Sequence, residues 1–475
     1  MRVKVNKLWA TVDASEAQLR ELYNFFSVEI SHARMNPRWN KAIKYGAWDG
    51  RQHYFNRISG RMPSGLVPLI PSHLKPEIIY SEEDDGSFGI DETIKLVERA
   101  RVDLRLKGVE LSDFQRETIC RFIELKKGIA WLATNAGKTE IAAGVVSILR
   151  IPTLYLIHRK TLLHQTAKRI YGRTGIRCNK IGDGFNESFD NRFLTIGMTQ
   201  SLPKPVKKNQ AFYDQFKMII IDEAQHASAN TWYKIAMKCD APYRLALTGT
   251  PFTGKDDKDL RLLACTSAQI ILRVRNQELI EKGWSAKPTV HMWPSQYREN
   301  NFSWRMARES MIVDNSKYNE MIVQIAKQNW EGGKTTLILV DIIKHGSRIT
   351  QRLAAEKIDA KFLTGAADSP YREKVLNQFR SGKLGVVIAT SILDEGVDVP
   401  AIKSLILAGG GKSAIRTLQR VGRALRKKHD VNMADIHDFV HFGNYYLMEH
   451  SQQRIDLYKE EGFEIIWEKE IEVET

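Results

Sequence analysis

Cysteine is scarce in this 475-residue sequence, and long apolar runs are missing. The four cysteines, Cys120, Cys178, Cys239 and Cys265, lie far apart and form no C-x-x-C pair. We therefore expect neither a disulfide framework nor a zinc ribbon, and we interpret the cysteines as core residues of a cytoplasmic protein. No apolar stretch approaches the ~18 residues that span a bilayer, and the first residues lack a signal-peptide core. The sequence therefore predicts no membrane-spanning segment, and the partner that we expect is not a membrane.

Acidic residues are the minority among the charges. The chain has 71 Lys and Arg against 56 Asp and Glu, which gives a net charge of +15, and it shows no solenoid repeat or low-complexity tract. With 43% hydrophobic and 9% aromatic residues, a disordered or fibrous protein is excluded. The length allows about three domains. The basic excess favours a polyanionic partner, with nucleic acid ahead of an anionic membrane surface.

Much of this basic charge is concentrated near the amino terminus. Between positions 31 and 65, seven basic residues face the single acid Asp49, and aromatic residues are interleaved with them. Alternation and then a helical period before this stretch predict a small α+β domain over residues 1–80. We expect it to bind nucleic acid through Arg38, Lys41, Lys44 and Arg51. In the alternative interpretation, Trp39, Trp48 and Phe55 form a small core and the cations are a solvated face.

The rest of the chain reads as two α/β blocks. Residues 81–107 begin with the acidic stretch SEEDDGSFGIDE, which predicts a linker or exposed loop. Apolar runs separated by helical patterns then predict parallel sheets covered on both faces, in domains at 108–285 and 286–475. The runs are TLYLIHR, FLTIGMT, KMIIIDEA and YRLALTGT in the first block, and TTLILVD, KFLTG, LGVVIATS and KSLILAG in the second.

A phosphate-binding loop is predicted at LATNAGKTE, where a helix opens after an apolar run. Lys138 can neutralise the β and γ phosphates, and the Thr139 hydroxyl can ligate Mg²⁺. The strict G-x-x-x-x-G-K-[ST] pattern is not met, because Leu132 replaces the first glycine. Asn135 stands where glycine is common, and asparagine tolerates the positive φ that such a turn needs.

Two acids support this prediction. Asp222 and Glu223 follow the apolar run MIII, at the edge where parallel sheets place their ligands. The aspartate can hold the metal and the glutamate can activate water, although a lone DEA is also a common acidic helix cap. Together with Lys138 they predict an Mg²⁺-dependent NTPase.

Three arginines in the second block can supply the remaining cation. Arg420, Arg423 and Arg426 would share one helix face, which suits either the γ-phosphate transition state or a nucleic-acid surface. Gly396 and Asp398 precede them in the same block.

In chain order, FQRETI, ATNAGKT, LIHRKTLLHQ, MTQSL, DEAQH, LTGTP, ATSILDEGVDVP and QRVGRALR resemble the successive motifs of superfamily 2 helicases. The flanks FFSVEISHARMNPRWNKAIKYGAWDGR and HDFVHFGNYYLMEHSQQRIDLYKEEGFEI are similar to those of the phage UvsW type, DNA helicases that remodel branched recombination and stalled-fork structures. Because the chain reads DEAQ rather than DEAD or DEAH, it departs from the RNA-unwinding DEAD-box group.

The resemblance implies two tandem RecA-like domains that clamp ATP, and it assigns roles to individual positions. The implied nucleotide and metal contacts are Phe114, Gln115, Thr134, Asn135, Ala136, Gly137, Lys138, Thr139, Asp222, Gly396 and Asp398. The implied catalytic residues are Lys138, Asp222, Glu223, Gln419, Arg423 and Arg426, while Thr248, Gly249 and Thr250 would couple hydrolysis to domain movement. Nucleic acid would contact Arg159, Thr199, Gln200 and Thr390.

The function expected from this resemblance is ATP-driven unwinding or branch migration of DNA in replication, recombination and repair. The partner would be forked or branched DNA with single-strand/double-strand junctions, and the enzyme would be a monomer, in the host cytoplasm if phage-encoded. A double-strand DNA translocase subunit of a restriction or nuclease complex would share every ATPase motif, and an RNA helicase stays an alternative. His437 and His441 have a zinc-like spacing but no third ligand nearby, so we expect a structural role for them.

Overall fold

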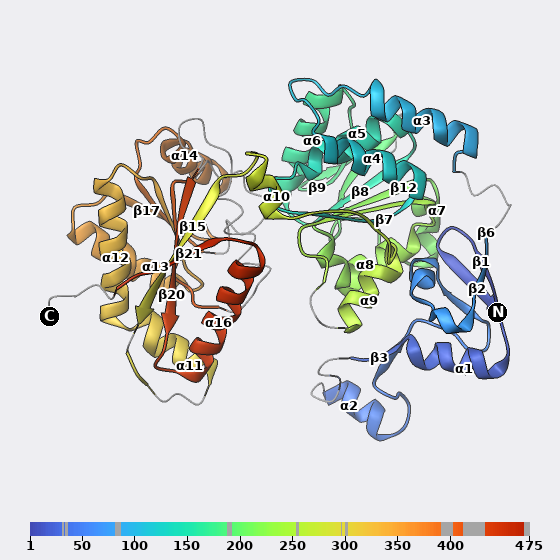
Figure 1. Ribbon diagram of the computed structural model, residues 1–475, viewed down its shortest axis with the longest axis horizontal. Helices are drawn as coiled ribbons and strands as arrows, with labels where there is room; N and C mark the ends of the chain where they lie inside the picture. The colour runs from blue at the N-terminus through green and yellow to red at the C-terminus, as the bar shows by residue number, and fades with distance from the viewer. Residues whose placement is uncertain are drawn as a thin grey trace. The chain divides into compact units, whose positions relative to one another are not determined.

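The computed structural model describes residues 1–30, 33, 37–80, 87–187, 192–252, 256–295, 297–299, 303–390, 402–411 and 433–469 (Figure 1). The chain divides into two compact units. The first consists of residues 1–132 and 137–274, and the second of residues 275–475 together with the short loop 133–136.

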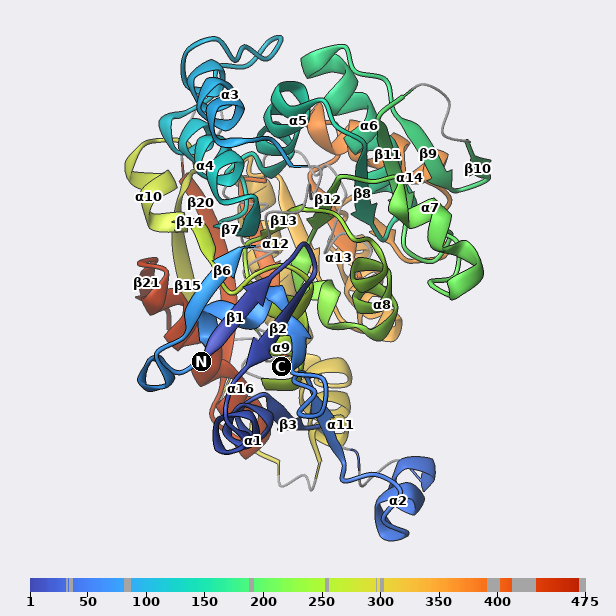
Figure 2. The same ribbon diagram turned by 90° about the vertical axis from the view of Figure 1, so that its right-hand side faces the viewer.

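The amino-terminal part of the first unit is a small α+β domain, as predicted (Figure 2). Its sheet has the order β5-β2-β1-β6, and β3 pairs with β4 in a separate two-stranded antiparallel sheet. In β1 exposed and buried residues alternate, so that Val3 and Val5 enter the core. The elements are β1 (Arg2–Val5), β2 (Trp9–Asp13), α1 (Glu16–Phe25), β3 (Ser27–Glu29), α2 (Pro37–Lys44), β4 (Arg51–His53), β5 (Arg61–Pro63) and β6 (Glu77–Tyr80).

This small domain shares one hydrophobic core with the α/β domain that follows. Leu66 and Leu263 belong to the same cluster of buried side chains. The approach is close at Gly65, whose carbonyl accepts a 2.8 Å hydrogen bond from Ala268 N and where an added Cβ would overlap the backbone of Leu263. Tyr54 hydroxyl donates to Asp257 O at 3.2 Å. The two parts of the first unit therefore form a continuous packed body.

The α/β domain of the first unit is built on an eight-stranded sheet of order β10-β9-β11-β8-β12-β13-β7-β14. All neighbouring strands are parallel except β10 and β9. Helices α4, α5 and α6 lie over one face, and α8 and α9 over the other (Figure 1). The strands are β7 (Lys127–Leu132), β8 (Thr153–Ile157), β9 (Asn179–Gly182), β10 (Phe185–Asn186), β11 (Leu194–Met198), β12 (Met218–Asp222), β13 (Tyr243–Thr248) and β14 (Ile270–Val274). The helices are α3 (Ile90–Val102), α4 (Asp113–Leu125), α5 (Lys138–Leu149), α6 (Lys160–Thr174), α7 (Gln210–Asp214), α8 (Asn230–Lys238) and α9 (Asp256–Cys265).

The second unit has a seven-stranded, all-parallel sheet of order β17-β18-β16-β19-β20-β15-β21. Successive residues of one strand enter opposite cores: Leu337 packs with α14 and α16, whereas Ile338 packs with α12 and α13. This explains the continuous apolar runs. The strands are β15 (Lys287–Ser295), β16 (Thr336–Leu339), β17 (Ala360–Leu363), β18 (Val386–Ala389), β19 (Ser404–Leu407), β20 (Met433–His441) and β21 (Glu464–Trp467). The helices are α10 (Asn276–Glu281), α11 (Trp304–Arg308), α12 (Ser316–Glu331), α13 (Ile343–Ala355), α14 (Ser369–Arg380) and α16 (Tyr445–Glu460).

The predicted fold class, two RecA-like parallel-sheet domains with a small amino-terminal domain, is confirmed. All eight predicted apolar runs contain a strand. The stretch 81–107, predicted as a linker, instead contains helix α3, which packs on α4 because Leu96 and Ala100 are buried. No helix in the described parts of the chain is long and apolar enough to cross a membrane.

Candidate nucleotide-hydrolysis site

The predicted phosphate loop joins the end of β7 to the start of α5. Asn135 has φ 75° and Gly137 has φ 76°, so the loop uses two left-handed residues to turn into the helix. Lys138 is the first residue of α5, with Thr139 beside it, and its Nζ donates to Leu132 O at 3.2 Å. This places the ammonium group across the loop. A helix amino terminus with a lysine and a hydroxyl in its first turn is suited to hold phosphate and metal.

Gln115 contacts this loop from helix α4. Its side chain is buried, and its Oε1 accepts a hydrogen bond from Ser112 N at 3.0 Å. Its amide nitrogen lies so close to Gly137 that a Cβ there would overlap it. Glycine at 137 is therefore required both by its positive φ and by the glutamine. The neighbouring Phe114 has different surroundings and lines a cavity of about 420 Å³ together with Arg101, Asp113, Arg116, Glu117, Cys120 and Leu272.

Asp222 ends strand β12 and is almost completely buried. Tyr155 hydroxyl donates to its Oδ2 at 3.0 Å, and Glu223 N donates to its Oδ1 at 3.0 Å. Burial raises the pKa of Asp222 to about 6, helped by the negative charge of Glu223 and opposed by Lys138 and the Tyr155 hydrogen bond. The opposing effect of Lys138 links the acid electrostatically to the phosphate loop. Tyr155 was not anticipated from the sequence, where its strand shows only a hydrophobic pattern.

A chain of hydrogen bonds connects Glu223 to strand β13. Gln225 Nε2 donates to Glu223 Oε2 at 3.0 Å, and Thr248 hydroxyl donates to Gln225 Oε1 at 2.6 Å. Thr250 N in turn donates to the Thr248 hydroxyl at 3.1 Å. We call these four residues the Glu223–Thr250 relay. Glu223 itself has φ 49°, a left-handed conformation that directs it out of the strand.

The loop after β13 is also held from β7. Trp131 Nε1 donates to Gly249 O at 2.9 Å, and the Arg273 guanidinium lies 3.8 Å from the centre of the Trp131 ring. This tryptophan was missed in the sequence, where it is one more apolar residue of a buried run. The loop is thus fixed on both sides, by Gln225 and by Trp131.

The donor set fits a divalent metal. Thr139 offers a hydroxyl and Asp222 a carboxylate, both oxygen ligands of the kind that Mg²⁺ prefers. Burial and the negative charge of Glu223 raise the pKa of Asp222, and a bound cation would offset both effects by favouring the ionised carboxylate. When bound, such an ion would polarise the phosphate oxygens, while these residues hold and orient it.

Comparisons with known proteins identify the family. Residues 108–253 match the family model described as "Type III restriction enzyme, res subunit", and residues 316–428 match "Helicase conserved C-terminal domain". Together the two matches take in more than half of the chain. The chain belongs to the superfamily 2 helicases. The helicase is therefore an ATP-hydrolysing enzyme.

Individual relatives show how far the similarity extends. The helicase is 27% identical to "DNA 3'-5' translocase XPB2" of Sulfurisphaera tokodaii over 67% of this chain and 79% of the relative. It is 24% identical to "ATP-dependent DNA helicase uvsW" of Enterobacteria phage T4 over 96% of both chains. Among solved structures, a putative HsdR subunit of a type I restriction enzyme from Vibrio vulnificus superposes with a TM-score of 0.59 at 19% identity, over 81% of this chain and 72% of that one. This last likeness concerns the fold.

The predicted nucleic-acid contacts of the first unit lie together in the helicase. Gln200 Nε2 donates to His158 O at 2.9 Å, and the Thr199 hydroxyl donates to Gln200 Oε1 at 3.2 Å. Arg159 Nε donates to His158 Nε2 at 3.2 Å. The ring of His158 lies 4.5 Å from that of His226, four residues after Asp222, so this group adjoins the hydrolysis site. Both histidines were missed, because a lone histidine carries no motif signal.

The amino-terminal cations separate into two groups. Arg51 donates to Ser27 O at 2.6 Å, and Arg61 lies 4.1 Å from the Trp9 ring, so both help to hold the domain together. Lys41 and Lys44 are exposed on α2. The side chain of Arg38, on the same helix, lies outside the described residues.

The aromatic residues beside these cations divide in the same way. Phe55 is buried, as the small-core interpretation requires, but Trp39 and Tyr45 are 41% and 74% exposed. Trp39 packs edge-on against Trp48 with ring centres 5.9 Å apart. Helix α2 and the turn after it therefore present both cations and aromatic rings to solvent.

In the second unit, Thr390 follows β18 and its N–H donates to Leu363 O at 3.2 Å. Gly396, Asp398, Gln419, Arg420, Arg423 and Arg426 lie outside the described residues. His437 is buried beside Trp293, whose Nε1 donates to its Nδ1 at 3.1 Å. His441 is completely buried, and no group of three or more metal-ligating side chains occurs in the part of the chain that the structure describes. Cys120, Cys239 and Cys265 are buried as predicted, while Cys178 is half-buried.

Proposed function

We propose that this ATP-dependent helicase acts on DNA and unwinds or branch-migrates forks and recombination intermediates. The observation that carries this proposal is the similarity to the T4 uvsW protein over 96% of both chains, which includes the small amino-terminal domain as well as the motor. A similarity confined to the motor domains would not support the recognition of forked or branched DNA. The proposed domains are 1–80 for DNA binding, with 108–285 and 286–475 as the motor.

In this proposal, Lys138 and Thr139 hold the phosphates of ATP and its Mg²⁺, and Asp222 completes the metal site. Glu223 orients the attacking water through its carboxylate. Through the hydrogen bonds of the Glu223–Thr250 relay, the conformation of the loop after β13 depends on the position of that carboxylate. Arg423 and Arg426 supply positive charge to the transition state, as arginine fingers do in related phosphoryl-transfer sites. Gln115 responds to nucleotide binding in the phosphate loop, because its side-chain amide lies against Gly137.

DNA would be held mainly through its backbone, so that movement along it is independent of sequence. Arg159, Thr199 and Gln200 form the contact surface of the first unit, and Thr390 contributes from the second. Lys41 and Lys44 would bind DNA phosphates near a junction, while Trp39 and Tyr45 would stack on exposed DNA bases. Exposed aromatic side chains on and just after a basic helix are suited to recognise the structure of a DNA junction.

Strand displacement tests this proposal directly. The wild-type protein and Lys138→Ala are compared with ATP on forks, four-way junctions and blunt duplexes of equal length. We expect the wild type to process forks and junctions in preference to the duplex and Lys138→Ala to process none. Equal rates on all three DNA substrates would contradict the branched-DNA role, and the same rates from Lys138→Ala would contradict the ATP-driven role.

A second candidate is a double-strand DNA translocase, favoured by the match of residues 108–253 to the restriction-enzyme family model. A translocase displaces a bound triplex-forming strand without separating the duplex. The displacement of such a third strand, with no product from any fork or junction, would favour this second candidate.

A further inference from the structure

Exposed aromatic side chains gather at one end of the second unit, where helix α16 begins. Tyr445, the first residue of α16, is 75% exposed, and Phe442, just before the helix, is 52% exposed. Tyr297, which follows strand β15, is 46% exposed. A single exposed ring is ordinary, but a group of rings on one surface marks an interaction site.

Backbone contacts hold the segment after β15 against the turn that leads into α16. Glu299 N donates to Gly443 O at 3.3 Å, and a Cβ at Gly443 would overlap the backbone of Tyr297. Asn444 Nδ2 donates to Glu299 O at 3.1 Å, while the same side chain caps the first turn of α16. The rings before and after Gly443 therefore adjoin the segment that carries Tyr297.

Helix α11 contributes a cation to the same end of the unit. It packs on α16 through Trp304, whose ring centre lies 4.3 Å from that of His450. Its Ala307 is buried, while Arg305 is exposed. We call six exposed residues of these segments the Tyr445 surface, which consists of Tyr297, Arg298, Arg305, Phe442, Tyr445 and Met448.

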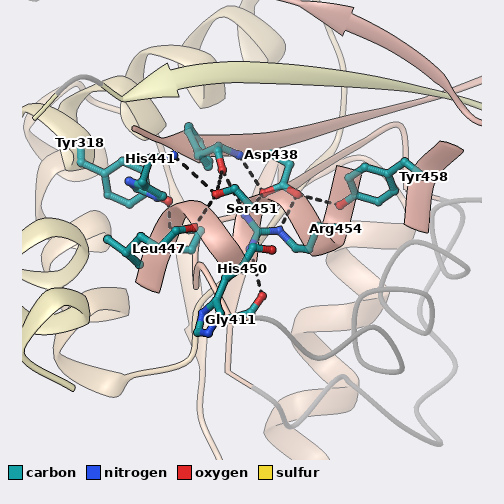
Figure 3. Close-up of polar contacts among 11 residues, drawn as sticks. Tyr318, Gly411, Asp438, His441, Leu447, His450, Ser451, Arg454 and Tyr458 are labelled. Atoms are coloured by element: carbon teal, nitrogen blue, oxygen red, sulfur yellow. Dashed lines mark hydrogen bonds and ion pairs between the residues drawn. The ribbon is translucent and has the colours of Figure 1, made fainter. Parts of the chain in front are cut away.

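A buried network fixes the opposite side of α16 to the sheet. Arg454 Nε donates to Asp438 Oδ2 at 2.8 Å and its Nη2 donates to Oδ1 at 3.0 Å (Figure 3). Tyr458 hydroxyl donates to Asp438 Oδ2 at 2.8 Å, and Arg454 Nη1 donates to Gly411 O at 3.0 Å. The helix is thus held in one orientation, with the Tyr445 surface towards solvent. Side chains on such a fixed element lose little conformational entropy when they bind a partner.

The Tyr445 surface lies where two paired strands project beyond the rest of the sheet. Strands β15 and β20 stay paired as far as Ser295 and His441, whereas β19 pairs with β20 only as far as His437. The further residues of β20 extend it by about 13 Å. All strands of this sheet are parallel, so their carboxyl ends form one edge, where such sheets bind ligands. Thr390, which the proposed function assigns to DNA, follows β18 on the same edge.

The charge of the Tyr445 surface favours a polyanion. Both of its arginines are exposed, and none of its six residues is acidic. Among the acids beside it, Glu309 pairs with Lys344 at 2.8 Å and Glu449 accepts a hydrogen bond from Gln453 at 3.0 Å. Aromatic rings stack on the faces of unpaired bases, while arginines contact the phosphates of the same strand. This combination fits a single strand better than a duplex, in which the base faces are already stacked.

We propose that the Tyr445 surface binds single-stranded DNA. Phe442 and Tyr445 stack on unpaired bases, and Arg298 and Arg305 contact the phosphates of that strand. The proposal rests on the proposed action on DNA and adds to it a base-stacking site in the second unit.

Fluorescence anisotropy of the full chain with labelled oligothymidylate, and with a blunt duplex of equal length, tests this site. For Phe442→Ala/Tyr445→Ala we expect the affinity for oligothymidylate to fall at least about 20-fold, because each stacked base contributes a factor of about five or more. The affinity for the duplex should change by less than about twofold, since a duplex offers no free base faces to these rings.

Three further variants separate stacking from charge and from general effects of substitution. Phe442→Tyr/Tyr445→Phe keeps both rings and should bind oligothymidylate as the wild type does. Arg298→Gln/Arg305→Gln should reduce the slope of log K against log salt by about 0.7 for each phosphate that is no longer neutralised, whereas removal of the rings should leave that slope unchanged. Trp330→Ala is the matched control, because Trp330 is also 46% exposed but lies against Gly385, at the opposite edge of the sheet.

Thermal unfolding shows whether each variant is folded. A folded Phe442→Ala/Tyr445→Ala protein that binds oligothymidylate as tightly as the wild type would overturn the proposal. So would self-association of the wild type that this variant abolishes with no change in oligothymidylate affinity, because the surface would then be a contact between copies of the chain. If the double variant does not fold, Tyr445→Ala alone, at the most exposed of the three rings, should lower the affinity at least about fivefold, and an unchanged affinity would overturn the proposal.

Strand displacement from forks separates this proposal from the proposed function. A wild type that binds oligothymidylate through the Tyr445 surface but displaces no strand would refute the proposed function alone. A wild type that remodels forks, with unchanged oligothymidylate affinity in the folded double variant, would refute the Tyr445 surface alone.

Discussion

The Thr248 hydroxyl and the Gln225 carboxamide are joined by a buried 2.6 Å hydrogen bond. Gln225 uses its other end to contact Glu223 at 3.0 Å, so a single side chain connects the acid that follows β12 with the loop that follows β13. The fourth residue of the DEAQ stretch is the point where this chain departs from DEAD and DEAH. Its amide can donate in one direction and accept in the other, as this relay requires.

Removing the relay should slow hydrolysis and uncouple it from movement. In Gln225→Leu, Thr248 and Glu223 both lose their partner, a loss of about 1–2 kcal/mol that corresponds to a roughly 5- to 30-fold lower kcat. We expect strand displacement to fall further than ATP hydrolysis, because the loop after β13 no longer follows Glu223. Steady-state hydrolysis and fork unwinding, measured in parallel, check this. Gln210→Leu on the surface helix α7 is the control, and wild-type coupling in Gln225→Leu would refute the relay.

The loss of ATPase activity at acidic pH, which is the acid limb of the pH profile, should follow the protonation of Asp222. This carboxylate must be ionised to hold the metal, and its pKa is raised to about 6, so activity should fall as the pH drops through that value at low Mg²⁺. Higher Mg²⁺ favours the ionised form and should move the limb to lower pH. Tyr155→Phe removes a hydrogen bond that lowers the pKa of Asp222, so it should move the limb towards neutral pH. An unchanged limb in Tyr155→Phe would show that another group controls it.

The second unit should lose stability in mild acid. Burial lowers the pKa of His345 to about 4 and of His437 and His441 to about 3. The folded state therefore binds fewer protons than the unfolded state, and stability present above pH 6.5 is lost as the pH falls below that value. At pH 5.5 the loss should be on the order of 1 kcal/mol for each histidine.

His291 opposes this trend, because hydrogen bonding to Asp435 raises its pKa and its contribution is fully present below pH 6.5 and lost as the pH rises. Hydrogen exchange of peptides from β20, compared at pH 7.5 and 5.5 after correction for intrinsic exchange rates, checks the balance. His441→Leu should reduce the acid sensitivity, while His73→Gln, at an exposed position, should not. Equal protection at both pH values in the wild type would contradict this account.

Substitutions on α2 should weaken fork binding without affecting the motor. Lys41→Glu/Lys44→Glu removes two exposed cations, so the slope of log K against log salt should fall by about 0.9 for each DNA phosphate that the protein no longer neutralises. Basal ATP hydrolysis should not change. Lys4→Glu, on an exposed position of β1, is the control, and equal fork affinity in the α2 variant would exclude this helix as a DNA-binding element. Deleting residues 1–80 is a poorer test, because the shared core around Leu66 and Leu263 would become exposed.

The sequence predicted those features whose signal is local. Apolar runs located eight of the 15 described strands in the two α/β sheets. GKT and DE located the phosphate loop and its acids, because parallel strands bring their carboxyl ends to one edge. Tyr155, Trp131 and Arg454 were not found, since each acts through a partner far away in the chain: Asp222, Gly249 and Gly411. Helix α3 was missed because the acidic, glycine-containing stretch before it resembles a loop, and the helix is stabilised mainly by burying Leu96 and Ala100 against α4.

The central claim is that ATP bound at Lys138 and hydrolysed with Asp222 and Glu223 drives the remodelling of DNA. The most direct measurement is ATP hydrolysis by the wild type and by Lys138→Ala, each with and without forked DNA. We predict hydrolysis by the wild type that forked DNA stimulates strongly, and no hydrolysis by Lys138→Ala under either condition. Wild-type protein that hydrolyses no ATP with any DNA, or Lys138→Ala that hydrolyses it at the wild-type rate, would contradict the account.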